Sequence, residues 1–385
     1  MTTPAEDSPP RVPLGTVLRE WGTIGCIGFG GPPTHIRLLR NLCVERRRWI
    51  GATEFEDAIA TCNLLPGPAS TQLSIYCAWR VRGRWGALVG GAAFIIPGLI
   101  VILGLAALFL AGSPPRWVLA AGAGAGAAVA AVAVHAGAAL IPASWQRRTS
   151  AVRWPVYLVA GAVAAALLGP WLVVVLLACG AVELARTTTL PRSGARSMPV
   201  LAFQSLTLGT LGSLCWVALK VGALSYGGGF VIIPLMQADA VDHYHWMTGA
   251  QFLNAVALGQ ITPGPVVQTV AVVGYAAAGL LGGVLASVVA FSPSFLFILL
   301  GAKHFDRIRS NSHVRAFLDG AGPAAIGAIL GSAVPLAMSI SQTWQYVVLA
   351  VALVAVFSRV NVVITLLVAA VAGILATSIG LPLPN

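Results

Sequence analysis

The stretch NLLPGPASTQ, residues 63–72, lies at the centre of an apolar run from residue 53 to residue 79. A run of this length can cross a bilayer as a helix, which needs roughly 17–25 residues. Pro66-Gly67-Pro68 would break such a helix at its midpoint, because proline lacks a backbone N–H and its ring clashes with the preceding turn. The stretch therefore predicts two half-helices that meet at a tip.

The composition is typical of a protein embedded in lipid. Of 385 residues, 57% are hydrophobic and 9% are charged, against about a quarter charged in soluble domains, and the mean hydropathy is +0.86. Several apolar runs are long enough to span a bilayer, among them residues 85–110, 117–141 and 281–300. Continuous apolar runs indicate helices and not a barrel. The sequence thus predicts an all-α polytopic membrane protein.

Several classes of function are disfavoured. The net charge of +11 does not indicate nucleic-acid binding, because the arginines lie in short loops between apolar runs. The six cysteines form no CxxC pair and most lie in apolar runs, which favours buried thiols over a metal site or a disulfide. Walker, HExxH and GxSxG motifs are absent, so we predict no cofactor and no enzyme activity. Residues 1–13 lack the pattern of a signal peptide and indicate a disordered tail.

The broken segment occurs twice in the chain. Residues 49–68 align without gaps on residues 246–265, so that Pro66-Gly67-Pro68 falls on Pro263-Gly264-Pro265, an offset of 197 (263 minus 66). At the same offset, GCIGFGG (25–31) matches GALSYGG (222–228). Such recurrence predicts two related halves. They are residues 14–185 and 199–385, joined by a cytoplasmic linker at 186–198.

Each half contains the same series of predicted segments. A glycine-broken segment and a Pro-Gly-Pro-broken segment are followed by two long helices and two short ones. In the first half these are residues 14–36, 53–79, 85–111, 117–142, 154–168 and 170–185; in the second they are 201–237, 249–277, 280–302, 316–340, 343–357 and 360–379. The short helices barely span a bilayer, so full crossings by residues 154–185 and 343–379 stay open.

The charges of the loops predict that the two halves are inverted. The loop before the first tip carries Arg46, Arg47 and Arg48, whereas its counterpart carries Asp239 and Asp242 and no lysine or arginine. Positive loops lie on the cytoplasmic side, so these loops lie on opposite sides, as in inverted-repeat transporters.

The flanks of the broken segments extend this prediction. Both flanks of the first segment are basic, since Arg80, Arg82 and Arg84 follow it, and neither flank of the second is. Each broken segment is therefore predicted as a re-entrant hairpin. The full prediction is about ten transmembrane helices plus two hairpins in an inner-membrane protein with both termini outside the cytoplasm.

Polar residues beside the two tips form the candidate substrate site. Half-helix N-termini present unpaired N–H groups and the positive end of the helix dipole, which favour an anion. The polar candidates are Asn63, Ser70, Thr71, Gln72, Gln260, Thr262, Gln268 and Thr269. These side chains could instead only cap the broken helix ends, but we favour anion binding.

The glycine breaks are a second set of candidates. They contribute Gly30, Gly31, Ser225, Tyr226, Gly227 and Gly228. Glycine lets a backbone approach either a ligand or a neighbouring helix closely, and the sequence leaves both alternatives open.

Lys220 is the one lysine deep inside an apolar run, where a cation is costly and is a functional candidate by default. Its counterpart in the first half is Thr23, and snorkelling to an interface is the alternative role. His35 could donate to an anion or cap a helix. Arg19 and Glu20 could pair with each other.

The remaining charges indicate the kind of transport. Acidic residues are almost absent from the apolar runs, which argues against a carboxylate proton relay. The basic stretch at residues 46–48 predicts a lipid headgroup anchor that also concentrates anions at a cytoplasmic mouth.

These motifs resemble the chromate ion transporter family. The matching stretches are GFGGPP (28–33), VERRRWI (44–50), LLPGPASTQ (64–72), KVGALSYGGGFVIIPLMQ (220–237) and TPGP (262–265). The chain departs from the family pattern at Pro33, Thr34 and Ala69, the last often being acidic in the family. The resemblance implies export of chromate from the cytoplasm, with sulfate as the similar tetrahedral dianion.

The leading hypothesis is a secondary transporter whose oxyanion site lies between the two tips, with Lys220 as countercharge, and which works by alternating access. Alternatives are a transporter of another organic or inorganic anion, or a membrane-embedded enzyme acting on lipid-linked phosphate, for which we find no catalytic cluster. Membrane lipids are expected partners. The coupling and the oligomeric state, including a homodimer, stay open.

Overall fold

The structure is a computed structural model that describes residues 12–168, 171–187, 209–225 and 231–384. Every regular element in these ranges is a helix, which confirms the all-α prediction. Most of the predicted tail and linker lies outside the described residues, as do the candidates Tyr226, Gly227 and Gly228.

The helices follow the predicted segments closely. Those of the first half are α1 (Leu14–Ile27), α2 (Pro32–Arg40), α3 (Ala52–Cys62), α4 (Ala69–Phe109), α5 (Arg116–Gln146), α6 (Arg153–Val163) and α7 (Leu172–Thr187). Those of the second half are α8 (Thr210–Leu224), α9 (Ile232–Gln237), α10 (Gly249–Ile261), α11 (Thr269–Gly301), α12 (Phe305–Ser310), α13 (Ser312–Met338), α14 (Thr343–Phe357) and α15 (Val362–Ser378). The sequence did not indicate the short helix α12.

Helices α4 and α11 each fold back on themselves at a glycine. Gly83 has φ +64° and ψ −153°, and Gly279 has φ +66° and ψ −158°, a conformation that favours glycine. A Cβ on Gly91 would lie 2.9 Å from Cγ1 of Ile75, whereas a straight helix would separate these residues by about 24 Å. Each reversal lies where the sequence predicted the boundary between a broken segment and the next long helix.

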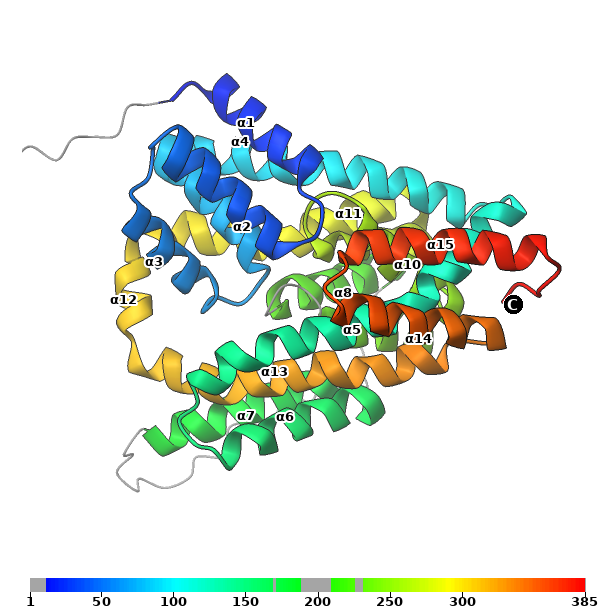
Figure 1. Cartoon of the computed structure of the whole chain (residues 1–385). Helices are drawn as coiled ribbons and strands as arrows, with labels where there is room; N and C mark the ends of the chain where they lie inside the picture. Colours follow the sequence, from blue (N-terminus) through cyan, green and yellow to red (C-terminus); the bar gives the residue numbers. More distant parts are fainter. Residues whose placement is uncertain (1–11, 169–170, 188–208, 226–230, 385) are drawn as a thin grey trace, which may run out of the picture.

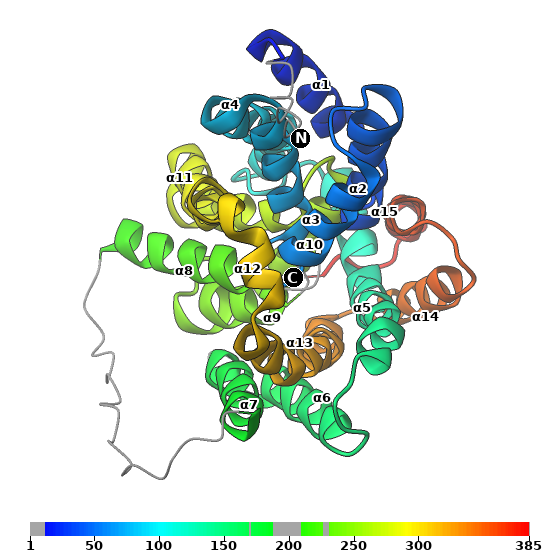
Figure 2. The same cartoon turned by 90° about the vertical axis from the view of Figure 1, so that its left-hand side faces the viewer.

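The first layer of the molecule is a row of helices. Helices α4 and α11 pack together, α1 packs on α4 and α8 packs on α11, so the row runs from α1 through α4 and α11 to α8 (Figure 2). Glycine permits the close contacts, because a Cβ on Gly25 would lie 2.7 Å from the carbonyl oxygen of Phe94. Gly222 packs in the same way on the carbonyl of Ala290. Matching parts of the two halves thus line up side by side.

The second layer exchanges helices between the halves. Helices α5 and α13 lie side by side; α14 and α15 pack on α5, whereas α6 and α7 pack on α13 (Figure 1). Gly161 contacts the backbone of Ala324, and Gly373 contacts that of Ala120. The short helices of each half therefore cover the long helix of the other half, an arrangement that hydropathy along the chain does not indicate.

Long apolar helices make this an integral membrane protein. Four segments of the described chain have the length and composition to cross a bilayer: Ala69–Phe109, Arg116–Gln146, Val266–His304 and Ser312–Met338. Shorter apolar helices accompany them, and large apolar side chains such as Val351 and Leu375 are exposed on α14 and α15. The number of crossings, the inversion of the halves and the re-entrant paths stay predictions.

Candidate functional site

The two Pro-Gly-Pro tips share a backbone conformation. Gly67 has φ +117° and Gly264 has φ +98°, values that favour glycine. Helix α3 ends before the first tip and α4 begins after it, and α10 and the turn leading into α11 flank the second tip in the same way. Both breaks therefore lie between two helix ends.

The second tip is sealed and bound to the first half. The backbone N–H of Gly264 donates to the carbonyl of Gly28 (3.0 Å), and the Gln268 side-chain amide donates to the carbonyl of Ile95 (2.7 Å). Gly98 lies so close that an added Cβ would overlap the carbonyl oxygen of Pro263. Residues 262–270 are all buried. The first glycine break, α4 and the second tip thus form one contact region.

The first tip is more open. Gln72 donates to the carbonyl of Pro66 within the same tip (2.6 Å), and both Asn63 and Pro66 are exposed. A Cβ on Gly67 would lie 3.3 Å from Oγ of Ser294 on α11. This tip therefore packs on the second half but keeps a side that solvent can reach.

His35 connects the first glycine break to the start of α4. Its Nε2 lies 2.9 Å from the carbonyl oxygen of Gly28 and its Nδ1 lies 3.2 Å from Oγ of Ser70, with the ring buried against Phe94. Because a carbonyl can only accept, Nε2 carries the proton and a neutral ring accepts at Nδ1 from the Ser70 hydroxyl. His35 therefore bridges two elements, a role that the sequence did not suggest.

Several candidate side chains carry buried polar atoms without a hydrogen-bond partner. Beside the tips these atoms are Thr71 Oγ1, Gln72 Oε1, Gln260 Nε2, Gln268 Oε1 and Ser294 Oγ, and at the second glycine break the atom is Ser225 Oγ. Buried polar groups normally have partners, so these atoms are available to a ligand or to water. The hydroxyls of Thr262 and Thr269 differ, because they donate to the carbonyls of Leu258 and Val266 in their own helix ends.

Of the glycine candidates, Gly30 and Gly31 have positive φ, at +92° and +74°. Gly31 lies beside the second tip, because a Cβ there would be 3.8 Å from Cγ2 of Val266. The structure thus brings the first glycine break, the start of α4 and the second tip together, and leaves Asn63 on the far, exposed side of the first tip.

Lys220 has a partner that the sequence did not indicate. Its Nζ lies 2.6 Å from Oδ2 of Asp239, and the side chains are 18% and 7% exposed. The sequence places Asp239 in the loop before the second tip, whereas in the structure it lies in a π-helical turn, Ala238–His243, that continues α9, and α9 packs on α8. The lysine is therefore a neutralised cation here. The sequence also suggests an ion pair between Arg19 and Glu20. This prediction is wrong, because Glu20 pairs with Arg47.

Two predicted apolar helices contain carboxylates, of which one is buried. Glu183 on α7 is 3% exposed and accepts from Arg153 (2.5 Å) and from the Tyr157 hydroxyl (3.0 Å). Asp319 lies one helical turn after Arg315 on α13. The expectation that acidic residues are almost absent from the apolar runs overlooked both. Neither tip contacts Glu183, so its role is to hold α6 and α7 together.

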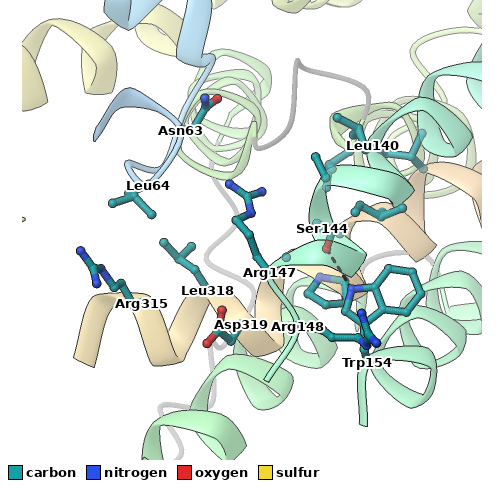
Figure 3. Close-up of a pocket in the computed structure, with 17 residues that line it drawn as sticks. Asn63, Leu64, Leu140, Ser144, Arg147, Arg148, Trp154, Arg315, Leu318 and Asp319 are labelled. Atoms are coloured by element: carbon teal, nitrogen blue, oxygen red, sulfur yellow. Dashed lines mark hydrogen bonds between the residues drawn. The ribbon is translucent and has the colours of Figure 1, made fainter. Parts of the chain in front are cut away.

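A cavity of about 600 Å³ opens beside the first tip (Figure 3). Its polar lining consists of Asn63, Ser144, Arg147, Arg148, Trp154, Arg315 and Asp319. The basic residues 46–48, which the sequence predicted at an anion mouth, are not part of it. Arg147 and Arg315 are 168 positions apart, so only the fold brings them together.

The part of the chain that the structure describes contains no group of three or more His, Cys, Asp or Glu side chains placed to hold a metal ion. Cys43, Cys62, Cys77 and Cys179 are buried, and all six cysteines are free.

Comparisons with known proteins agree with these features. A family model described as chromate transporter matches residues 15–184 and 212–374. A chromate transport protein from Cupriavidus metallidurans is 32% identical over 342 residues, covering 85% of this chain and 84% of that protein. A chromate transport protein from Pseudomonas aeruginosa is 28% identical, covering 96% and 94%. An uncharacterized transporter from Methanocaldococcus jannaschii is 25% identical, covering 91% and 92%. No solved structure matches.

Proposed function

The chain belongs to the chromate transporter family, and on this premise we propose that it is a secondary transporter that exports chromate from the cytoplasm by alternating access. The substrate site lies between the two Pro-Gly-Pro tips. Sulfate, which shares the tetrahedral shape and the double negative charge, is the expected competitor. The two halves, residues 14–185 and 199–385, act as the two inverted units of the transporter.

The observation that carries this proposal is the set of unpartnered buried polar atoms at the tips. Thr71 Oγ1 can donate to an oxyanion, and so can Gln260 Nε2. Thr71 lies in the first turn of α4, where the first N–H groups lack partners within the helix, and Gln260 lies one turn before the second break. Hydroxyl, amide and backbone N–H groups bind a tetrahedral oxyanion without a full countercharge. Buried polar groups normally have hydrogen-bond partners, so the absence of partners here supports a ligand that supplies them.

Alternating access is supported by the difference between the tips. The first tip is exposed at Asn63 and opens on the arginine-lined cavity, whereas residues 262–270 of the second tip are buried. A site reached from one side while closed to the other is what one state of an alternating-access transporter requires. The arginines of the cavity lie at the end of α5 and near the start of α13, and clustered arginines are typical of the cytoplasmic side, so we assign this state as inward-facing.

The membrane potential supplies a driving force for export. Moving one elementary charge through 100 mV is worth about 2.3 kcal/mol, so a dianion that leaves an inside-negative cell gains about twice that. Basic loops on the cytoplasmic face also contact anionic lipid headgroups. No nucleotide is needed for this direction of transport.

Uptake into everted membrane vesicles tests the proposal, because their cytoplasmic face points outward and export becomes uptake. Vesicles that contain the full chain should accumulate radiolabelled chromate when an inside-positive potential is imposed, and excess sulfate should reduce the rate. The matched control is the Gln72→Leu/Gln268→Leu double variant, which removes a tip amide from each half. Uptake equal to that of vesicles without the protein would overturn the proposal.

A further inference from the structure

The arginine-lined cavity beside the first tip has the charge of an oxyanion site. Arg147, Arg148 and Arg315 line it together with a single carboxylate, Asp319. The arginines of this lining outnumber its carboxylate, so the wall of the cavity is basic and favours an anion. Its volume of about 600 Å³ equals the liquid volume of on the order of twenty water molecules. The cavity therefore accommodates a hydrated anion and does not require its dehydration.

Arg148 and Arg147 differ in how their side chains are held. The Arg148 guanidinium stacks 3.9 Å from the Trp145 ring centroid and donates to the Trp145 carbonyl, so its orientation is fixed. Arg147, at the end of α5, forms no ion pair with another described residue, and Figure 3 shows its guanidinium pointing toward Asn63 and Leu64 of the first tip. A guanidinium presents its donors in a planar fork that fits two oxygens of a tetrahedral anion.

Asp319 is placed between the arginines as a competing anion. It is one turn from Arg315 on α13 and lines the same cavity as Arg147. It forms no ion pair with either in the described part of the chain. A tethered carboxylate at this position lowers the affinity of the cavity for a free anion, since like charges repel. Weak binding suits a site from which the anion must move on.

We propose that this cavity is a separate loading site, in which Arg147 and Arg315 bind a tetrahedral oxyanion before it reaches the first tip and Asp319 keeps the binding weak. Asn63 and Leu64 belong both to the cavity wall and to the tip, so an anion bound there is next to the path between the tips. The inference rests on the proposed transport only for the choice of ligand.

A phosphate-bearing lipid headgroup has the same chemistry as a free oxyanion. We favour the free ion, because it is the ligand of the proposed transport and because tip residues form part of the cavity wall together with Trp154, which is 8% exposed and bonded to Ser144. The experiment separates the two sources by measuring binding with and without anionic lipid.

Equilibrium dialysis of the purified full chain in a neutral detergent tests the site, with radiolabelled sulfate as the probe. The Gln72→Leu/Gln268→Leu variant serves as the background, so that binding at the tips does not obscure the cavity. In this background Arg147→Gln should weaken binding about tenfold, the loss of one charge-assisted hydrogen-bond pair. Arg315→Gln should act in the same direction, and Asp319→Asn should strengthen binding severalfold.

Arg116→Gln is the matched control, because Arg116 is an exposed arginine at the opposite end of the same helix α5. Equal binding by the Arg116 and Arg147 variants would overturn the proposal. So would binding of phosphatidylglycerol without any binding of sulfate. The outcome is separable from the proposed function, because an Arg147-dependent binding site can persist in a chain that moves no chromate. Conversely, if the Arg147→Gln variant takes up chromate with an unchanged KM, the loading site is refuted and the proposed transport is not.

Discussion

The two Pro-Gly-Pro tips have nearly the same backbone but different surroundings. Gly67 and Gly264 both have positive φ, near +100°. Gln72 bonds to the carbonyl of its own tip, whereas the corresponding Gln268 bonds across the molecule to Ile95 of the other half. Asn63 is exposed at the mouth of a cavity, whereas its counterpart Gln260 is buried.

The two tips are therefore not equal sites, although their sequence and backbone conformation are repeated. The same amide holds one tip together internally and ties the other tip to its neighbour. The residue that contacts each tip from the opposite half differs as well, since Gly98 contacts the second tip and the corresponding Ser294 contacts the first. The variants below exchange or remove these differences.

The largest expected effect comes from the ion pair that only the second half has. Lys220 and Asp239 correspond to Thr23 and Leu42 of the first half. Lys220→Met should lower the free energy of unfolding by about 3 kcal/mol, because Asp239 is left buried and unpaired. The double variant Lys220→Met/Asp239→Leu should recover most of this loss. Thermal unfolding of the purified variants measures it.

Transport by the double variant then decides the role of Lys220. We expect it to stay inactive in chromate uptake although its stability is restored, because the lysine lies on α8, the helix that leads into the second glycine break. Wild-type uptake by the stable double variant would reduce Lys220 to a structural residue.

The contacts behind the tips should give the next largest effect. Gly98→Ser copies the residue of the first tip into the second, where its Cβ overlaps the Pro263 carbonyl. We expect a loss of about 2 kcal/mol of stability from overpacking and at least tenfold slower uptake. The reverse change, Ser294→Gly, should cost about 1 kcal/mol, the helix penalty of glycine. Equal effects of the two substitutions would show that the tips are packed alike.

The smallest difference is expected for the two glutamines. Gln268→Leu removes a buried hydrogen bond between the halves and should cost about 1 kcal/mol more stability than Gln72→Leu, whose bond lies within one tip. A comparison of their melting temperatures measures the difference. If Gln72→Leu were the more destabilising variant, the first tip and not the second would be the joint between the halves.

Much of the fold could be predicted from the sequence, because its signals are local. Two prolines around a glycine at residues 66–68 favour a break, whereas single prolines such as Pro97 and Pro293 lie inside helices. The glycines at 83 and 279 mark the reversals in α4 and α11. Apolar runs set the helix lengths. The exchange of the short helices between α5 and α13 has no such signal, because any apolar helix face can cover another.

Only part of the candidate site could be predicted, because contacts between distant segments have no local signal in the sequence. Residues beside the breaks, such as Thr71 and Gln268, could be found because a broken helix needs polar groups there. The contacts of Lys220 with Asp239 and of Arg147 with the cavity depend on how distant segments pack. A signal for the cavity was present in Asp319, a carboxylate in an apolar helix one turn after an arginine.

We propose that the two tips form one path whose ends are reached from opposite sides of the membrane. Asn63→Cys and Gln260→Cys place a thiol at equivalent positions of the two tips, in a chain whose native cysteines are replaced. A membrane-impermeant thiol reagent should label Asn63→Cys from the cytoplasmic side and leave Gln260→Cys protected. Saturating chromate on the opposite side should reverse this pattern. Equal labelling of both positions from the same side would contradict the account.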